Sequence, residues 1–142
     1  MKYQKVGQCG DVYLLVFDAG DEIATELQKF AAEFDGRLAS FSAIGALSSV
    51  ELVAYDPAIK DYRTSVTLDE QCELACMVGD IGRHEGKPVI HAYLTIGKLD
   101  GAVRAGHKTA VVRPTCELLL TVHRAVVEKR RDERWNLPLF KL

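Results

Sequence analysis

The spacing of hydrophobic positions changes along the chain and predicts the type of each element. Residues 12–17, VYLLVF, form a continuous apolar run, which is typical of a strand buried on both faces. Between residues 21 and 35, apolar side chains return every three or four positions with charged residues between them, which predicts an amphipathic helix. Asp21 is the expected N-cap of this helix, and Gly36 is placed to end it.

Alternating apolar and polar positions predict strands over most of the remaining chain. We expect residues 48–49 to separate two strands, and Gly45 to mark a bulge or a close approach of two backbones. Pro114 is expected at an edge or a break between two more strands, with a helix as the alternative for residues 116–127. The glycine-rich segment around His84 is expected to be a loop. The expected strands cover residues 38–47, 50–55, 62–68, 71–81 and 89–96, and two pieces within 109–127.

One helix and about seven or eight antiparallel strands predict an α+β domain with a central, mostly antiparallel sheet and one main flanking helix, at about 21–35. The length of 142 residues fits one domain with its own core. Hydrophobic residues make up 48% of the chain and charged residues 27%, which is a globular balance. We therefore expect a single domain over residues 1–142, with a core at about 10–127 and a C-terminal segment at 128–142.

The chain carries a net charge of −2 and has a sequence pI near 6.1. Proteins that coat nucleic acid or anionic membranes need clustered Lys and Arg, so this composition favours neither class, and any DNA contact would be local. The N-terminal residues lack the apolar core of a signal peptide, and no apolar stretch approaches the length of a transmembrane helix. We expect a cytoplasmic protein without a membrane partner.

The four cysteines lack the paired spacing of a zinc ribbon. Alternation over residues 71–81 would place Cys72 and Cys76 on one face of a strand, about 13 Å apart. That separation is too long for one metal ion or a disulfide. We interpret all four, including Cys9 and Cys116, as buried, reduced thiols.

The C-terminal segment combines a charge run with an apolar tail. Residues 128–134, EKRRDER, interleave basic and acidic side chains, so their local field largely cancels. Residues 135–142, WNLPLFKL, are mostly apolar and would be exposed unless they fold back over the sheet or dock on another subunit. The predicted subunit contacts are Trp135, Leu137, Leu139 and Phe140.

Residues 89–107 carry the most candidate chemistry. Their alternation places His91 and Tyr93 on the same face of a strand. A turn at residues 100–101, and a glycine directly before His107, would bring that second histidine back beside the first.

Two interpretations of these histidines are open: they hold the hairpin in shape, or they line a cleft. In a cleft, histidine and lysine donors could bind a carboxylate or phosphate, or the pocket could take another small molecule. Glu73 or Glu117 could supply a carboxylate, although glutamates on strands more often face solvent. The pocket residues would be His91, Tyr93, His107 and Lys108.

Four stretches of the chain, in order, resemble the plants and prokaryotes conserved (PPC) domain family. They are residues 42–57 (SAIGALSSVELVAYDP), 73–82 (ELACMVGDIG), 88–108 (PVIHAYLTIGKLDGAVRAGHK) and 112–121 (VRPTCELLLT). The resemblance implies a strongly curved antiparallel sheet with a flanking helix, assembled as a homotrimer. It also implies a regulatory binding module of the kind described as a candidate DNA-binding protein. In plants the domain is joined to AT-hook segments, whose Arg-Gly-Arg core this chain lacks.

The same fold resembles that of alpha-acetolactate decarboxylase, a zinc enzyme. Family members often carry two histidines in an H-x-H pattern on a strand and a third in the following Gly-His turn, a set that would hold zinc with water in an open position. Carried over to this chain, the first and third ligands fall on His91 and His107. The second falls on Tyr93, and Lys108 replaces the family's usual leucine. The resemblance thus implies an alternative function, an enzyme with a metal- or small-molecule-binding pocket.

Overall fold

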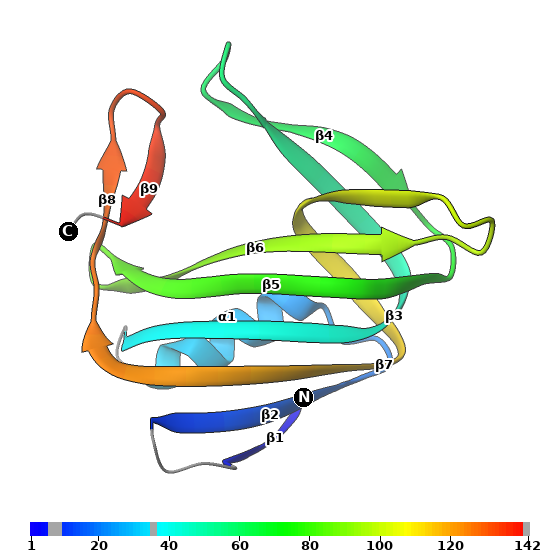
Figure 1. Ribbon diagram of the computed structural model, residues 1–142, viewed down its shortest axis with the longest axis horizontal. Helices are drawn as coiled ribbons and strands as arrows, with labels where there is room; N and C mark the ends of the chain where they lie inside the picture. Colours follow the sequence, from blue (N-terminus) through cyan, green and yellow to red (C-terminus); the bar gives the residue numbers. More distant parts are fainter. Residues whose placement is uncertain (6–9, 35–36, 141–142) are drawn as a thin grey trace.

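The computed structural model describes residues 1–5, 10–34 and 37–140, and shows one α-helix packed against strands that curve into a barrel (Figure 1). Near the N-terminus are β1 (Lys2–Lys5), β2 (Asp11–Asp18), α1 (Ile23–Ala31) and the short 3₁₀ helix η1 (Ala32–Phe34). The central strands are β3 (Arg37–Asp56), β4 (Asp61–Leu68), β5 (Cys72–His84), β6 (Lys87–Gly97) and β7 (Val103–Val126). A C-terminal hairpin follows, made of β8 (Lys129–Asp132) and β9 (Leu137–Phe140).

The strand order β1-β2-β7-β6-β5-β3-β4, with an additional β7–β3 pairing, closes β7, β6, β5 and β3 into a ring. Every pairing between these strands is antiparallel. The predicted α+β class with an antiparallel sheet and one main helix is therefore confirmed. No helix in the described part of the chain has the length and hydropathy of a membrane span.

The core lies between the sheet and the apolar face of α1, which contacts β6 and β7. The helix buries Ile23, Leu27, Phe30 and Ala31, as its spacing predicts. Alternate residues of β2 and β7 point into the same core: Leu15, Phe17, Cys116, Leu118, Leu120 and Val122. Burial of this kind stabilises the fold by removing apolar surface from water.

The N-cap of α1 is Glu22, so the prediction of Asp21 was wrong by one residue. The Glu22 carboxylate accepts hydrogen bonds from the backbone N–H groups of Ala24 and Thr25. Asp21 is occupied elsewhere, because its carboxylate accepts the backbone N–H of Asp18 and pairs with the N-terminal ammonium. The predicted helix end at Gly36 lies outside the described residues.

Replacing Glu22 with alanine should destabilise the protein by about 1 kcal/mol, because two N–H groups at the helix start lose their acceptor. Urea denaturation followed by circular dichroism measures this loss. Glu33→Ala, at an exposed position of η1, is the matched control. Equal unfolding midpoints for the two variants would contradict the capping role.

Strands β3 and β7 are each continuous, although the sequence predicts a break in both. In β3 the pairing with β7 shifts register on either side of Leu47. Residues 48–49 therefore lie at an irregularity within one continuous strand, not between two strands. In β7, three residues around Pro114 lie opposite the single residue Ala46 of β3, between the pairs Gly45–Cys116 and Leu47–Val112. A proline fits there because a bulge leaves backbone N–H groups out of the ladder. The helical alternative for residues 116–127 was also wrong.

Strand β5 is longer and less regular than predicted. It runs through to His84, so the expected loop is only a tight turn at residues 85–86, where both residues have positive φ. A register shift between Leu74 and Cys76 inverts the alternation, so Cys76 is exposed rather than buried. The predicted burial of Cys72 and Cys116 is confirmed, and burial raises the pKa of the Cys116 thiol to about 11. Cys9 lies outside the described residues.

Candidate functional site

The β6–β7 hairpin brings His91, Tyr93 and His107 together. Leu94 pairs with Gly106 in this hairpin, so His107 arrives beside the strand that carries the other two rings. The His91 and His107 rings stack with centroids 5.2 Å apart and an interplanar angle of 17°. The Tyr93 ring lies 3.8 Å from that of His107 and 5.5 Å from that of His91.

Gly106 is required where the hairpin meets β3. A Cβ atom at this position would lie 2.9 Å from the carbonyl oxygen of Val53. The β3 and β7 backbones can therefore approach closely there, with Val53 paired to His107. The close approach sets His107 against β3 and leaves its ring facing β6.

Hydrogen bonds orient both imidazoles. The Nδ1–H of His107 donates to the carbonyl oxygen of Ala92 at 3.0 Å, which leaves Nε2 as the acceptor of the neutral ring. Nδ1 of His91 lies 3.6 Å from Oδ2 of Asp80, its cross-strand partner on β5. Burial, helped by the nearby charge of His91, holds the pKa of His107 below its ordinary value against the opposing hydrogen bond to Ala92.

Asp80 contacts His91, and Lys129 pairs with Asp80. Sequence analysis missed both residues. The Lys129 side chain is almost fully buried, and its Nζ lies 2.5 Å from Oδ1 of Asp80 and 4.7 Å from the centre of the Phe140 ring. Burial would raise the pKa of the Asp80 carboxyl, but hydrogen bonds and charges from His91 and Lys129 hold it below its usual value. In the sequence, Lys129 lies within a charge run whose other residues are exposed or half-buried, so no local signal marked its burial.

Lys108 is paired with a carboxylate. Its residue has a positive φ of 115°, and its Nζ lies 2.5 Å from Oε1 of Glu51 on the neighbouring strand β3. The hydrogen bond from Lys108 lowers the pKa of the Glu51 carboxyl. The charge that the sequence suggested for anion binding is therefore largely balanced within the protein.

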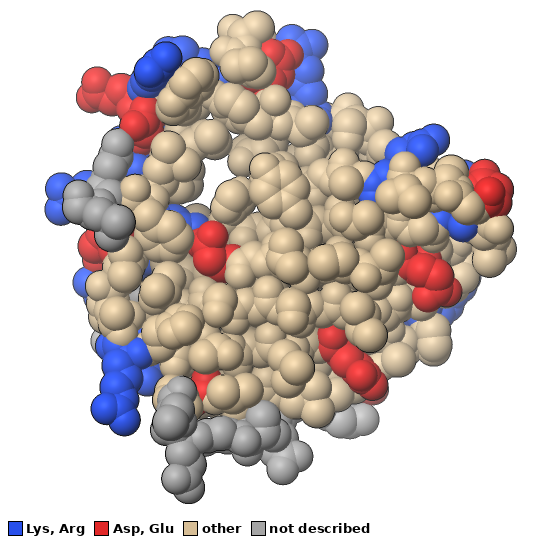
Figure 2. All heavy atoms as spheres, viewed as in Figure 1, with Lys and Arg blue, Asp and Glu red and all other residues tan. Residues whose placement is uncertain are grey.

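Both histidines line two adjoining cavities. The larger, of about 630 Å³, is lined by Gln28 of α1, Tyr62, both histidines and Lys108, among others. The smaller, of about 350 Å³, shares Tyr62 and the histidines with it and is closed by Tyr55, Tyr93 and the C-terminal hairpin. Figure 2 shows a hollow beside this hairpin.

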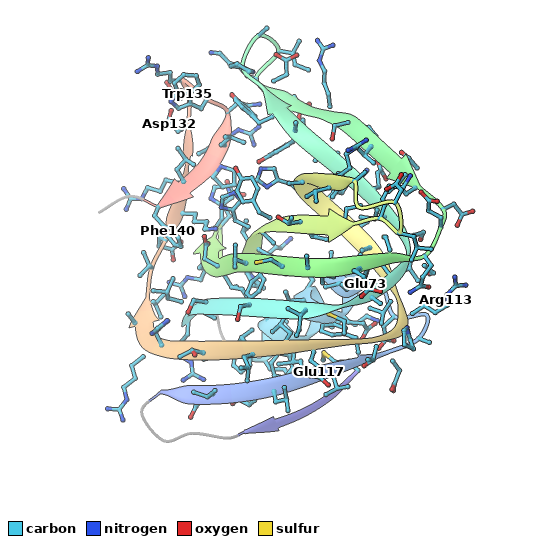
Figure 3. The ribbon with its side chains drawn as sticks, turned by 45° about the vertical axis from the view of Figure 1, so that its right-hand side comes forward. Glu73, Arg113, Glu117, Asp132, Trp135 and Phe140 are labelled. Carbon is cyan, nitrogen blue, oxygen red and sulfur yellow. The ribbon has the colours of Figure 1, made fainter. Side chains whose placement is uncertain are left out.

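The C-terminal hairpin folds back and forms one wall of the smaller cavity, as one of the two alternatives for the tail predicted. Leu137 and Leu139 line that cavity, and the Tyr55 hydroxyl donates to the backbone carbonyl of Trp135 at 2.6 Å. Trp135 lies at the tip of the hairpin, whereas Phe140 lies at its base near β5 (Figure 3). Subunit contacts through these side chains stay a prediction.

Glu73 and Glu117 lie away from the histidines. Both line a separate cavity of about 630 Å³ between β3, β5 and β7. In Figure 3 they lie on the sheet, far from the labelled residues of the C-terminal hairpin. The carboxylate that faces the ring cluster is that of Asp80, because the alternation of β5 and its register with β6 place it opposite His91.

Comparison with known proteins identifies the fold family. The sequence matches the family model of the Plants and Prokaryotes Conserved (PCC) domain, also written PPC, over residues 4–124. The chain belongs to this family. None of the curated proteins matches the chain.

Three solved structures superimpose over almost the whole chain. A "putative DNA-binding protein" from Ralstonia eutropha JMP134 is 30% identical, with a TM-score of 0.88 over 99% of this chain and 96% of that one. A metal-containing protein from Archaeoglobus fulgidus is also 30% identical, with a TM-score of 0.84 and full coverage of both chains. A "putative DNA-binding protein" from Bacteroides thetaiotaomicron, 23% identical, shares the fold with a TM-score of 0.90 over 99% and 96% of the two chains.

The ring cluster of this PPC domain does not fit the three-histidine zinc site that the family resemblance implies. Within residues 1–5, 10–34 and 37–140, no group of three or more His, Cys, Asp or Glu side chains could hold a metal ion. Tyr93 stands in the place of the second histidine, and a phenol is a poorer zinc ligand than an imidazole. Zinc binding by His91 and His107 alone, with Tyr93 or water completing the site, stays a prediction.

The free energy of unfolding should fall as the pH is lowered from about 7.5 to about 5.5. Because the folded protein lowers the pKa of His107, the unfolded chain takes up this proton at a higher pH, and stability rises with pH around the ordinary histidine pKa of about 6.5. The His107→Phe variant keeps a ring in the stack and should show a flatter slope in urea denaturation.

The carboxyl groups act in a separate pH range. Asp21, Glu51 and Asp80 have pKa values lowered from 3.8 or 4.5, so their contributions to stability are lost only below about pH 5. If the free energy of unfolding changes as steeply between pH 7.5 and 5.5 in His107→Phe as in the wild type, groups other than His107 cause the pH dependence.

Proposed function

We propose that this PPC-domain protein is a homotrimeric binding module that takes a small-molecule ligand in the cavities at His91, Tyr93 and His107. The observation that supports this most directly is the orientation of the two imidazoles, whose Nδ1 atoms face Ala92 and Asp80 inside the protein. Histidines that only hold a hairpin together would not require cavities at their rings. Here both rings line two of them.

The lining has the mixed character of a ligand site. Cavities of a few hundred Å³ with apolar walls and a few polar groups are typical of small-molecule pockets. Val89 and Ile90 supply apolar surface, whereas the phenols and imidazoles supply hydrogen-bonding groups. If the site performs catalysis, the His107 imidazole is placed to accept a proton and the adjacent Tyr93 hydroxyl to donate one.

Ligand-observed NMR with a panel of phenol, benzoate, benzylamine and acetate tests the ligand site. We expect at least one of these probes to bind, and His107→Ala to remove that binding. Glu73→Ala, whose side chain lines the separate cavity, is the control and should bind as the wild type does. Binding of no probe, or equal binding to His107→Ala, would overturn the proposal.

The trimeric part of the proposal is supported by an apolar face on the outer side of the sheet, opposite α1. Ser42 of β3 pairs with Val78 of β5 and Leu119 of β7, so these side chains adjoin across three strands. Ile44, Val78 and Leu119 are 62%, 47% and 53% exposed. Figure 2 shows that this face is mostly uncharged, with Lys and Arg toward its rim. We assign it to contact with further copies of the chain.

Light scattering tests the assembly. Ile44→Lys should lower the mass from that of a trimer to that of a monomer, because a charge would be buried in the interface. Leu139→Lys, on the C-terminal hairpin, tests the alternative contact surface that the sequence suggested. A monomeric mass for the wild-type protein would overturn the proposed trimer. A loss of mass only in Leu139→Lys would show that the subunits contact one another through the C-terminal hairpin instead.

A second candidate function is DNA binding, which the names of two similar structures suggest. The exposed arginines of the C-terminal segment, Arg130, Arg131 and Arg134, are the surface that could carry it. Anisotropy of a labelled 20-base-pair duplex should then show affinity that falls steeply as salt rises. It should also weaken when all three arginines are replaced by serine. No binding at about 50 mM salt would reject this candidate, because electrostatic attraction is strongest there.

A further inference from the structure

We infer that the ligand of the ring cavities is a neutral, planar aromatic molecule with an O–H or N–H group that donates a hydrogen bond to His107. This inference rests on the proposed ligand site and names the class of molecule that the site takes. It follows from three features of the walls: balanced charges, an oriented acceptor, and aromatic rings on several sides.

The lysines at the cavities are paired with carboxylates. Lys108 lies 2.5 Å from a Glu51 oxygen, and Lys129 lies 2.5 Å from an Asp80 oxygen. An anionic ligand would have to compete with these carboxylates for the ammonium groups. A cationic ligand would have to compete with the same ammonium groups for the carboxylates. A neutral ligand leaves both pairs intact and brings no charge that must be desolvated.

His107 presents a hydrogen-bond acceptor. Its Nδ1–H is held by the Ala92 carbonyl oxygen, so Nε2 carries the lone pair of the neutral ring. The ring lines both cavities, and burial lowers the pKa of His107, which favours the neutral ring at pH 7. A ligand O–H or N–H can donate to this nitrogen, whereas a carboxylate cannot.

The surrounding rings favour a flat ligand. Tyr93 and His91 pack around the His107 ring, and Tyr62 approaches it edge-on, with centroids 5.2 Å apart and an interplanar angle of 70°. Tyr55 offers its ring rather than its hydroxyl to the smaller cavity, because the hydroxyl donates a hydrogen bond to the Trp135 carbonyl. Aromatic pairs contribute about 0.5–1.5 kcal/mol each beyond the area they bury. An aromatic ligand can therefore gain contacts that an aliphatic one cannot.

Three probes of the same shape separate the ligand classes: phenol, benzoate and benzylamine are all monosubstituted benzenes. We would measure their dissociation constants by ligand-observed NMR at pH 7.5, on wild type and on two variants. His107→Phe keeps the ring and removes the acceptor. Glu73→Ala changes a side chain that lines the separate cavity and leaves the acceptor in place. The folding of both variants is checked by circular dichroism.

We expect phenol to bind more tightly than benzoate and benzylamine. His107→Phe should weaken phenol binding about tenfold, which corresponds to the loss of one hydrogen bond, and Glu73→Ala should leave it unchanged. Preferred binding of benzoate or benzylamine, or phenol binding that His107→Phe does not weaken, would overturn this ligand class while leaving the ligand site in place. Binding of none of the three aromatic probes would also overturn the ligand class. In that case, binding of acetate would still support the ligand site, and no binding of acetate would overturn the site as well.

Discussion

Gly45→Ala should destabilise the protein by about 3 kcal/mol, the upper end of the usual cost of overpacking a core. At Gly45, β3 and β7 approach so closely that a Cβ atom would lie 2.6 Å from both the Cα of Cys116 and the carbonyl oxygen of Thr115. These are backbone atoms, which cannot move aside as the end of a flexible side chain can. Chemical denaturation of the purified variant measures the change in the free energy of unfolding.

Gly97→Ala is the matched control, because a Cβ atom there meets nothing within 4 Å. Gly97 is also a strand residue, at the end of β6, so both substitutions add one methyl group to a strand. We expect the control to change stability by less than about 0.5 kcal/mol. Equal losses for the two variants would show that the contact between β3 and β7 can relax.

Lys129→Met should destabilise the protein by about 2–3 kcal/mol, somewhat less than is typical for breaking a wholly buried pair. The substitution leaves the Asp80 carboxylate in a partly buried position, with His91 as its one remaining ion-pair partner among the described residues. It also removes the ammonium group from the face of the Phe140 ring. Arg130→Met, at the exposed neighbouring position, is the control and should have little effect.

A double variant distinguishes the lost charge pair from lost packing. Asp80→Asn combined with Lys129→Met removes both charges, and replacing a whole buried pair by uncharged groups is often close to neutral. We therefore expect the double variant to be more stable than Lys129→Met alone in urea denaturation. A double variant that is no more stable than the single one would assign the loss to the packing of the lysine side chain rather than to the unpaired Asp80 carboxylate.

Local patterns predicted the elements whose signal is contained within one segment. The strand over residues 12–17 and the helix α1 lie where the pattern places them. The strand buries only Leu15 and Phe17 on one face, so the predicted burial of both faces was wrong. The juxtaposition of His91, Tyr93 and His107 was also accessible, because a single hairpin produces it. Each of these features depends on residues that are close in sequence.

The features that the sequence did not reveal depend on distant partners. Residues 48–49 and Pro114 look like strand ends, but each lies at a register shift that the facing strand accommodates. The contact between Asp80 and Lys129 joins β5 to the C-terminal hairpin, and no periodicity links positions so far apart. A charged residue in a charge run is normally solvated, so the burial of Lys129 could be learned only from the folded chain.

The pairing of β7 with β2, β3 and β6 also constrains the order in which the protein can be completed during synthesis. Residues 11–18 of β2 pair with residues 115–122 of β7, about a hundred positions later. While a ribosome is still making the middle of the chain, β3, β4 and β5 can form hairpins, but the edges of β2 and β3 that pair with β7 have no partner. Such non-local pairing slows folding. The sheet can close only after β7 has been made, so the last third of the polypeptide determines when the first strands become protected.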